Sequence, residues 1–373
     1  MISLYFHIPF CKKKCNYCDF YSITDEKQIN KFIAALKKEI ILRKNETHGK
    51  EIDTIFFGGG SPSVLTESQF CEISDFIKQN FKIAVNYEWT IEVNPENYSE
   101  EKAKIWQECG VNRLSIGIQS LNDDELNICG RIHDRKQAIG VLRSKILKRF
   151  DNVNADLIYG LPNQNKNSFS ETLKTVCKIP VIKHISLYEL TIAENSFFGK
   201  NREKFNLPNE SEIEKIVKYS RNFLQKSGFE RYEVSNFAKN GCRCRHNENY
   251  WNYGRYIGFG PSSHSFDGEN KRSANISDIE KYCELLNRNE IAADFIENLL
   301  LEQKKTEFLM LKLRTSDGFS LSEFGVKFGI DFLVKNKKYV NNLIENDYMI
   351  IKNGVCKLTD KGLDIADGIA IKL

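Results

Sequence analysis

Three cysteines near the N-terminus are the side chains of this sequence best suited to chemistry. Cys11, Cys15 and Cys18 stand in the stretch CKKKCNYCDF with the spacing C-x3-C-x2-C. A structural zinc site takes four ligands, usually as distant C-x2-C pairs, and fits this spacing poorly. A 4Fe-4S cluster takes one thiolate per iron, so three thiolates leave the fourth iron open to another ligand. The spacing therefore favours a reactive iron-sulfur cluster.

Other interpretations of the cysteines stay open. One is a zinc ion whose site is completed by His7 or a distant cysteine, and another is a chance group of buried cysteines. Cys242 and Cys244, in the stretch CRCRH, could also bind a metal ion. The remaining cysteines stand singly and are expected to be small buried hydrophobic residues. They are Cys71, Cys109, Cys129, Cys177, Cys283 and Cys356.

A second set of candidate residues lies at or near the C-terminal ends of expected strands. The set contains a run of three glycines, residues 58–60, together with Glu92, Gln119 and Asp156. Parallel barrels and open α/β sheets place their active sites at these strand ends. Because the three cysteines also follow an expected strand, the sequence predicts one shared site.

Six short apolar runs, alternating with helical stretches, are the elements that must position these residues. Strands that alternate with helices predict βαβ units and a parallel sheet, so the fold class is α/β. About six units favour a barrel or partial barrel over a small open sheet. The expected strands are 3–10, 53–60, 88–95, 113–120, 154–162 and 184–190, and the clearest helices are 25–44 and 67–81.

The alternating pattern breaks near residue 230. Two further strands, 230–238 and 256–266, flank the polar and aromatic segment 241–254. After residue 286, three short helices and two strands joined by an Asn-Gly turn resemble a winged-helix module of α+β type. We expect three parts, which are a barrel over 1–230, a barrel extension over 231–285 and the module over 286–373.

Composition and charge indicate an ordinary globular protein. The chain has 373 residues, 41% of them hydrophobic, and a formal charge of +4 from 54 basic and 50 acidic residues. This small excess gives no reason to expect nucleic acid as a partner, and the module has no dense basic stripe. The N-terminal residues do not resemble a signal peptide, and no apolar run approaches the roughly 20 residues that span a bilayer. Cysteines this few and uneven do not indicate a disulfide scaffold, so we expect a cytoplasmic protein.

Several motifs together resemble a known family. The cysteine spacing, with the aromatic Tyr17 before the third cysteine, resembles the signature of radical S-adenosylmethionine proteins. The blocks FFGGGSPS, EVNPE, RLSIGIQS, GRIHD, DLIYGLP, RYEVSNFA and GFGPSSHS resemble the oxygen-independent coproporphyrinogen III oxidase-like branch, over essentially the whole chain. The resemblance implies a partial (β/α)6 barrel. It also implies a 4Fe-4S cluster on the three cysteines, with S-adenosylmethionine chelating the open iron.

The resemblance also implies roles for residues near the cluster. Tyr5 is similar to the family's tyrosine beside the cofactor, and Tyr17 matches the aromatic residue that shields the cluster. Gly59, Gly60 and Ser61 match a glycine-rich loop whose missing side chains let backbone groups approach a ligand. Ser61 replaces the more usual threonine, a change that removes no ligand group.

Four further residues match the family's cofactor site. Glu92 matches the carboxylate that would hold the charged end of S-adenosylmethionine. Gln119, Arg131 and Asp156 match residues that line a nucleotide site, as two polar groups for sugar hydroxyls and a cation for a carboxylate. Cys129 stands where leucine commonly precedes the Gly-Arg pair, and this change removes no ligand either.

Two functions compete within this branch. The oxidases of porphyrin biosynthesis carry a fourth cysteine two residues after the third, where this chain has Phe20, and an extension ahead of the motif, whereas Tyr5 here is nearly the first residue. Both departures resemble the HemW-type heme chaperones, which hand heme to respiratory haemoproteins. The oxidase stays the alternative function, and a radical enzyme acting on another substrate class is a third.

The stretch RHNENYW resembles the H-N-x-x-Y-W motif of the HemW-type proteins. Imidazole commonly ligates heme iron, so His246 is the candidate ligand of heme as cargo, and Tyr250 and Trp251 could pack on the macrocycle. The other interpretation makes this segment a hydrophobic plug over the barrel. The remaining histidines considered are expected to be structural or near the cofactor, and they are His7, His133, His184 and His264.

Several properties stay undetermined by the sequence. They include whether S-adenosylmethionine is cleaved in the physiological role, which haemoprotein accepts the heme, and whether the chain is a monomer or a homodimer. A peripheral contact with the inner face of the cytoplasmic membrane is left open, because a respiratory partner would favour it but no basic amphipathic helix demands it.

Overall fold

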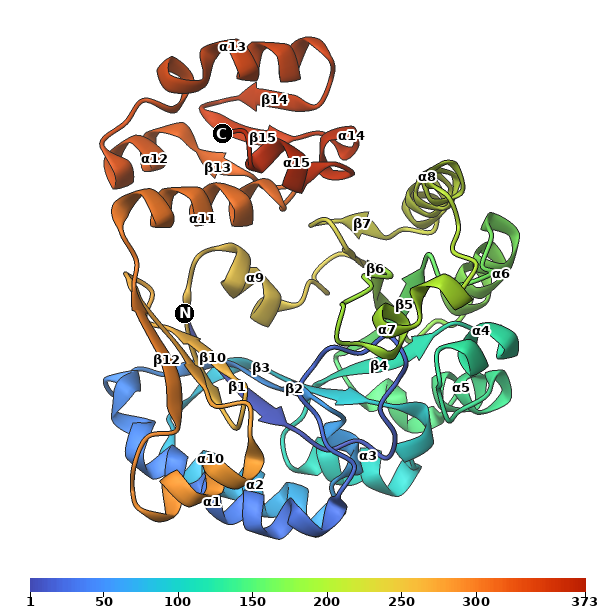
Figure 1. The fold of residues 1–373 in the computed structure, drawn as a ribbon, viewed down its shortest axis with the longest axis vertical. Coiled ribbons are helices and arrows are strands. Elements are labelled where there is room, and N and C mark those ends of the chain that lie inside the picture. The colour runs from blue at the N-terminus through green and yellow to red at the C-terminus, as the bar shows by residue number, and fades with distance from the viewer.

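Six parallel strands form the centre of the structure, a computed structural model that describes residues 1–373 (Figure 1). They lie side by side in the order of the chain, and each pairs in parallel with the next. All six predicted strands are therefore confirmed. The strands are β1 (Ile2–Ile8), β2 (Ile52–Gly59), β3 (Ile83–Val93), β4 (Arg113–Gln119), β5 (Asn152–Tyr159) and β6 (Ile182–Glu189).

Helices connect these strands and cover the outer face of the sheet (Figure 1). Side-chain caps define the starts of all of them except α1: in α2, for example, Thr66 accepts a hydrogen bond from the Gln69 amide while the Gln69 side chain bonds back to Thr66. This reciprocal box satisfies two amide groups that a helix start leaves free. The helices are α1 (Ile29–Arg43), α2 (Glu67–Asn80), α3 (Glu100–Glu108), α4 (Asp123–Ile128), α5 (Arg135–Leu142), α6 (Lys166–Cys177), α7 (Phe197–Lys200) and α8 (Glu210–Lys226).

Side chains of the parallel strands alternate between two environments, because successive residues of a strand point to opposite faces. One set is apolar and packs under the helices in a core of 57 buried residues. In β1 this set is Leu4, Phe6 and Ile8, each fully buried. Burying such a side chain contributes about 1.5–3 kcal/mol. The other set is largely polar and faces the concave inner side of the sheet.

Further strands extend both edges into one open sheet of twelve. The predicted strand 256–266 is two antiparallel strands, β9 (Arg255–Phe259), which pairs in parallel with β1, and β10 (His264–Phe266). The predicted strand 230–238 is likewise split into β7 (Glu230–Arg231) and β8 (Asn236–Ala238). The sheet does not close, since β12 and β7 are its edges. The partial barrel with additional strands is thus confirmed. The other added elements are α9 (Arg245–Trp251), β11 (Lys271–Asn275), α10 (Ile279–Asn287) and β12 (Ala293–Asn298).

The C-terminal residues form a separate α+β module with its own core. Phenylalanines 308, 319, 324, 328 and 332 pack against one another at its centre. Its last two strands meet at the predicted turn, where Asn353 and Gly354 both have positive φ angles, of 52° and 75°. The winged-helix-like order of elements is confirmed. They are α11 (Leu301–Leu313), β13 (Phe319–Ser320), α12 (Leu321–Phe328), α13 (Phe332–Glu345), β14 (Met349–Lys352), β15 (Val355–Leu358), α14 (Asp360–Leu363) and α15 (Ala366–Ala370).

The module lies over the inner side of the sheet, with α11 next to α9 (Figure 1). Arg221 of α8 and Arg231 of β7 both bind Asp364 of the module, at 2.5 Å and 2.7 Å. The strand β12 pairs with β11 in the large sheet, so residues 293–298 belong with the sheet although the predicted module began at 286. No helix has the length and apolar content needed to cross a membrane.

Candidate functional site

The inner face of the sheet carries the polar members of the strand alternation. Each central strand contributes at least one polar side chain there, so that neighbouring strands build a continuous polar surface. From β1 to β6 these side chains include Tyr5, His7, Thr54, Glu92, Arg113, Ser115, Asn154, Asp156, His184 and Ser186. Predicted site residues of three different strands, Tyr5 of β1, Glu92 of β3 and Asp156 of β5, therefore share one face.

Two carboxyl groups of the predicted site lie close enough to influence each other. Burial raises the pKa of Glu92 to about 8, and the neighbouring Asp156 adds to the rise, while the backbone amide of Gly59 donates to Glu92 and opposes it. Burial also raises the pKa of Asp156, which accepts hydrogen bonds from Ser115 at 2.9 Å and Asn154 at 2.8 Å. Asp156 lies in the middle of β5 rather than at its end. The pair can accept or release a proton near neutral pH.

Arg113 supplies the positive charge beneath these carboxyl groups. Its side chain is buried at the start of β4, and its charge lowers the pKa values of both Glu92 and Asp156. Nε of Arg113 has no hydrogen-bond partner. Its charge therefore favours the ionised form of both carboxyl groups and opposes the effect of burial.

The cysteine loop is fixed to the body of the protein by backbone contacts. The amide of Cys11 donates to Ile23 at 2.9 Å. The amide of Asn16 donates to Cys129 at 2.9 Å, and its side chain donates to Ile128 at 2.7 Å. The loop carbonyl of Asn16 accepts from Phe198 at 2.9 Å. These contacts attach the loop to α4 and α7, so its position does not depend on the thiols.

Arg131 points at this loop. Its guanidinium lies 3.5 Å from both the Cys15 sulfur and the Tyr17 hydroxyl, and it donates to Asn94 at 2.7 Å and to Gly117 at 2.9 Å. The side chain is only 4% exposed. The sequence predicted Arg131 as a cation for a cofactor carboxylate, and in the structure it lies beside the Cys15 sulfur and 3.9 Å from the carboxylate of Glu96.

The donor set of the loop fits an iron-sulfur cluster. No three His, Cys, Asp or Glu side chains in the structure converge on one point, as the ligands of a single metal ion do. A 4Fe-4S cluster does not require this, because each thiolate binds a different iron. Burial raises the pKa of Cys11 to about 12, so a metal or a nearby cation is needed to keep that sulfur as a thiolate. Arg131 provides such a cation.

The glycine-rich loop after β2 is packed against protein rather than open. A Cβ atom on Gly59 would lie 2.7 Å from the ring of His7, and one on Gly60 would lie 2.7 Å from the carbonyl oxygen of Phe10. Ser61 is buried, and its hydroxyl accepts from the side-chain amides of Asn94 and Asn97, at 3.1 Å and 3.2 Å. The glycines therefore let β1 and β2 approach each other just ahead of Cys11.

Tyr5, Tyr17 and Gln119 take different positions around the site. The Tyr5 hydroxyl lies 3.2 Å from Nδ1 of His7 on the same strand. Tyr17 packs on a small cluster that includes Cys129. Gln119 ends β4 with a φ of 64°, a strained left-handed conformation for this residue. Gln119 therefore lies at the strand end that the sequence predicted, whereas Tyr5 stands in the middle of β1 and Tyr17 in the cysteine loop.

His246 is held inside the protein by both ring nitrogens. Nδ1 lies 2.7 Å from the Thr54 hydroxyl and Nε2 lies 2.8 Å from the Tyr250 hydroxyl, and the side chain packs on Phe56. The residue is 1% exposed, and burial lowers its pKa to about 3, with Arg113 contributing. Iron could reach His246 only if one of these bonds broke, so the predicted ligand role does not fit this conformation.

The segment around His246 forms α9, which lies between the inner face of the sheet and α11. Trp251 at its end packs under the guanidinium of Arg314, 5.5 Å from the ring centre. Its indole nitrogen is buried without a partner. This placement agrees with the interpretation of the segment as a plug over the barrel.

The other cysteines are mostly buried, as predicted, but two of them form a pair that the sequence did not reveal. The sulfurs of Cys71 and Cys109 lie 2.9 Å apart, on α2 and at the end of α3. Residues 38 positions apart give no pairing signal in a single sequence. Cys244 is fully buried with its sulfur 3.6 Å from Glu88, whereas Cys242 is partly exposed.

A cavity of about 800 Å³ opens beside the cysteine loop, between the sheet and α11. Its size is within the range of ligand pockets, about 300–1,000 Å³. This cavity was not predictable from the sequence, because its walls come from segments more than 220 residues apart. Residues that line it include Tyr5, Phe20, Tyr250, Tyr256, His264 and Met310.

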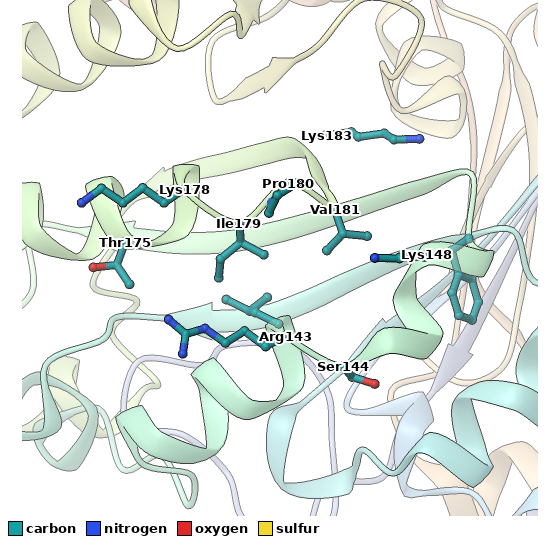
Figure 2. A pocket seen from close by; sticks show the side chains of 11 residues that line it. Arg143, Ser144, Lys148, Thr175, Lys178, Ile179, Pro180, Val181 and Lys183 are labelled. Atoms are coloured by element: carbon teal, nitrogen blue, oxygen red, sulfur yellow. The ribbon is translucent and has the colours of Figure 1, made fainter.

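A second cavity, of about 710 Å³, lies at the opposite, N-terminal ends of β5 and β6 (Figure 2). No predicted site residue lines it. Four basic side chains line this cavity, and no acidic side chain does. Figure 2 shows Ile179 and Val181 between the basic side chains. The basic residues are Arg143, Lys148, Lys178 and Lys183.

Comparison with known proteins finds matches along the whole chain. Residues 5–176 match the radical SAM superfamily, and residues 299–365 match the HemN C-terminal domain. The heme chaperone HemW of Bacillus subtilis is 32% identical over 333 residues, which cover 88% of this chain and 87% of that protein. HemW of Haemophilus influenzae is 31% identical over 363 residues, covering 91% of this chain and 92% of its own length.

The solved structures include one close match in fold. The coproporphyrinogen III oxidase HemN from Escherichia coli, described as a radical SAM enzyme, superposes with a TM-score of 0.87 over 99% of this chain and 89% of its own. The two sequences are 23% identical, so this likeness establishes the shared fold alone.

Proposed function

This chain belongs to the HemW family of the radical S-adenosylmethionine superfamily, and on that premise we propose that it binds heme and transfers it to haemoproteins. The observation that carries the proposal is the cavity of about 800 Å³ with aromatic walls beside the cysteine loop. A large, flat and mostly apolar ligand suits such walls.

Phe20 supports the chaperone over the oxidase. It lines the cavity and is 67% exposed, at the position where the oxidases carry a fourth cysteine. An exposed aromatic ring offers an apolar contact to a macrocycle, and it cannot supply the sulfur that the oxidases have there.

The three cysteines are proposed to hold a 4Fe-4S cluster. When bound, this cluster supplies an iron with a free coordination position, to which the amino and carboxylate groups of S-adenosylmethionine would bind. Arg131, 3.5 Å from the sulfur of Cys15, would stabilise that thiolate. Tyr17 would cover the loop from the side of α4.

The S-adenosylmethionine site is proposed to lie on the inner face next to the loop. Glu92 and Asp156 would receive polar groups of the cofactor, and Gln119 would add an amide at the adjacent strand end. Tyr5 would lie beside the cofactor. The run from Gly59 to Ser61 would shape the loop by close packing and by its bonds to Asn94 and Asn97.

The test is a heme titration beside an oxidase assay, with anaerobically prepared protein that contains its cluster. We expect heme binding in a defined stoichiometry and transfer to an apo-haemoprotein, with no conversion of coproporphyrinogen III when S-adenosylmethionine and reductant are added. Conversion of coproporphyrinogen III to protoporphyrinogen IX would instead establish the oxidase. Absence of both activities would contradict both functions.

We also propose a cytoplasmic location with a peripheral contact to the inner face of the membrane, where respiratory acceptor proteins lie. The basic cavity in Figure 2 supports this contact, because a Lys or Arg near an anionic lipid surface contributes about 1 kcal/mol. Lys178→Glu with Lys183→Glu should abolish sedimentation with anionic vesicles, and equal sedimentation of this variant and the unaltered protein would contradict the proposal. Neutral vesicles are the control. Light scattering on the protein without vesicles determines whether it is a monomer or a homodimer.

A further inference from the structure

The histidines of this chain separate into two groups by the state of their ring nitrogens. The chain has six histidines. In four of them both nitrogens have hydrogen-bonding neighbours, and each of these residues is at most 3% exposed. The four are His7, His133, His184 and His246. The two left with accessible imidazoles are His48, at a surface turn, and His264.

His264 is the one of these two that lines a cavity. It stands in β10, and its side chain opens into the space of about 800 Å³ beside the cysteine loop. Partial burial lowers the pKa of its ring, and the positive charge of Arg272 lowers it further. Both effects favour the neutral form of the imidazole, which is the form that binds a metal.

All the tyrosines of the cavity wall except Tyr256 have a hydrogen-bonded hydroxyl, so the wall presents mainly their ring faces. Tyr5 bonds with His7, and Tyr250 bonds with His246. The Tyr21 hydroxyl accepts from a backbone amide at 2.8 Å. With these oxygens already bonded, the wall offers aromatic surface for a flat ligand and one free imidazole for its metal.

The rim of the cavity carries a cation, Arg272, whose ion-pair partner is partly exposed to solvent. Arg272 of β11 forms an ion pair with Glu307 of α11, across the boundary between the sheet and the module. Both side chains are exposed by more than a quarter, at 29% and 28%, so a carboxylate from outside can replace Glu307. The guanidinium suits a carboxylate particularly well, since it can bind two oxygens at once.

We propose that heme binds in this cavity with its iron on His264 and one of its carboxylates on Arg272. The inference rests on the proposed heme chaperone function and assigns its site. This assignment differs from the sequence interpretation, in which His246 was the candidate ligand of the heme iron and His264 was expected to be structural or near the cofactor.

A titration of heme followed by absorbance tests this assignment. His264→Ala should lose the spectrum of imidazole-ligated heme and bind about 10- to 100-fold more weakly, and free imidazole should restore the spectrum. His48→Ala, the other accessible histidine, is the matched control and should behave as the unaltered protein. Circular dichroism and iron content establish that the variants are folded.

The outcomes separate this inference from the function on which it rests. If the unaltered protein binds no heme, the proposed function fails and the inference with it. If it binds heme and His264→Ala has the same spectrum and affinity, the inference alone is overturned. For the carboxylate, Arg272→Ala should remove an about tenfold preference for heme over its dimethyl ester, and a preference that persists would overturn that half of the assignment.

Discussion

Nε2 of His246 lies 2.8 Å from the hydroxyl of Tyr250, one turn further along the same short helix. The other ring nitrogen lies 2.7 Å from Thr54 of β2. The imidazole thus connects α9 to the sheet, and it does so as a neutral group, because burial and the charge of Arg113 hold its pKa near 3. His246 is therefore a structural connector whose effect depends on pH.

Replacing His246 by glutamine should remove one part of the acid sensitivity of the fold. The unfolded state binds a proton near pH 6.5 and the folded state only near pH 3, so stability is full above 6.5 and is lost as the pH falls. Between pH 7.5 and 5.5 the unaltered protein should lose about 1.4 kcal/mol more unfolding free energy than His246→Gln. Urea unfolding at both pH values measures this, with His48→Gln as control. Parallel losses in all three proteins would contradict the prediction.

Replacing Glu92 by glutamine should have the opposite pH dependence. Its carboxyl group has a pKa near 8 in the folded protein against 4.5 when free, so its contribution is full at low pH and is lost as the pH rises through 8. Between pH 6 and 8.5 the unaltered protein should lose about 2.5 kcal/mol that Glu92→Gln retains. Anaerobic chemical unfolding of the cluster-containing protein measures the difference.

The exposed Glu108, on α3, provides the matched control for this experiment. Glu108→Gln should follow the unaltered protein across the same pH range. If Glu92→Gln had the same pH dependence as the unaltered protein, Glu92 would be ionised at neutral pH. Burial and Asp156 would then not raise its pKa as argued above.

Ser61→Ala should destabilise the loop after β2. The Ser61 hydroxyl accepts from the amides of Asn94 and Asn97; Ser61 and Asn97 are buried and Asn94 is partly buried. Removal of the oxygen leaves the buried amide of Asn97 and the partly buried amide of Asn94 without this acceptor, at a cost of about 2 kcal/mol. Thermal unfolding should show the lower midpoint, whereas Ser68→Ala, which removes an exposed hydroxyl, should not. A midpoint equal to that of Ser68→Ala would refute the argument.

The strand positions were predictable because one physical rule generates them. A period of two places apolar residues such as Phe57 and Ile91 under the helices and polar ones on the other face, and six such runs were visible in the sequence. The division of residues 256–266 into two strands was not predictable. Gly260 and Ser262 turn the chain there with positive φ angles of 93° and 62°, inside an otherwise apolar run. β11 and β12, in the edge extension, were missed because they are short and largely exposed.

The site was predictable to the extent that it follows strand order. Glu92 and Asp156 approach each other because β3, β4 and β5 are neighbours. The state of His246 was not predictable, since its partner Thr54 is 192 residues away. The cavity around His264 was not predictable for the same reason, because α11, which is distant in sequence, forms one of its walls.

Replacing Cys11, Cys15 and Cys18 together by alanine should remove the cluster and leave the fold. The loop is attached by the amide of Cys11 and by Asn16, contacts that need no thiol, so circular dichroism should be unchanged. Anaerobic reconstitution should give about four irons per chain in the unaltered protein and almost none in the triple variant, with loss of the visible absorbance. A second triple variant provides the control, because its cysteines lie outside the loop and it should keep both signals. It is Cys71→Ala, Cys177→Ala, Cys283→Ala. Iron retained by the first variant would show that other residues hold the metal.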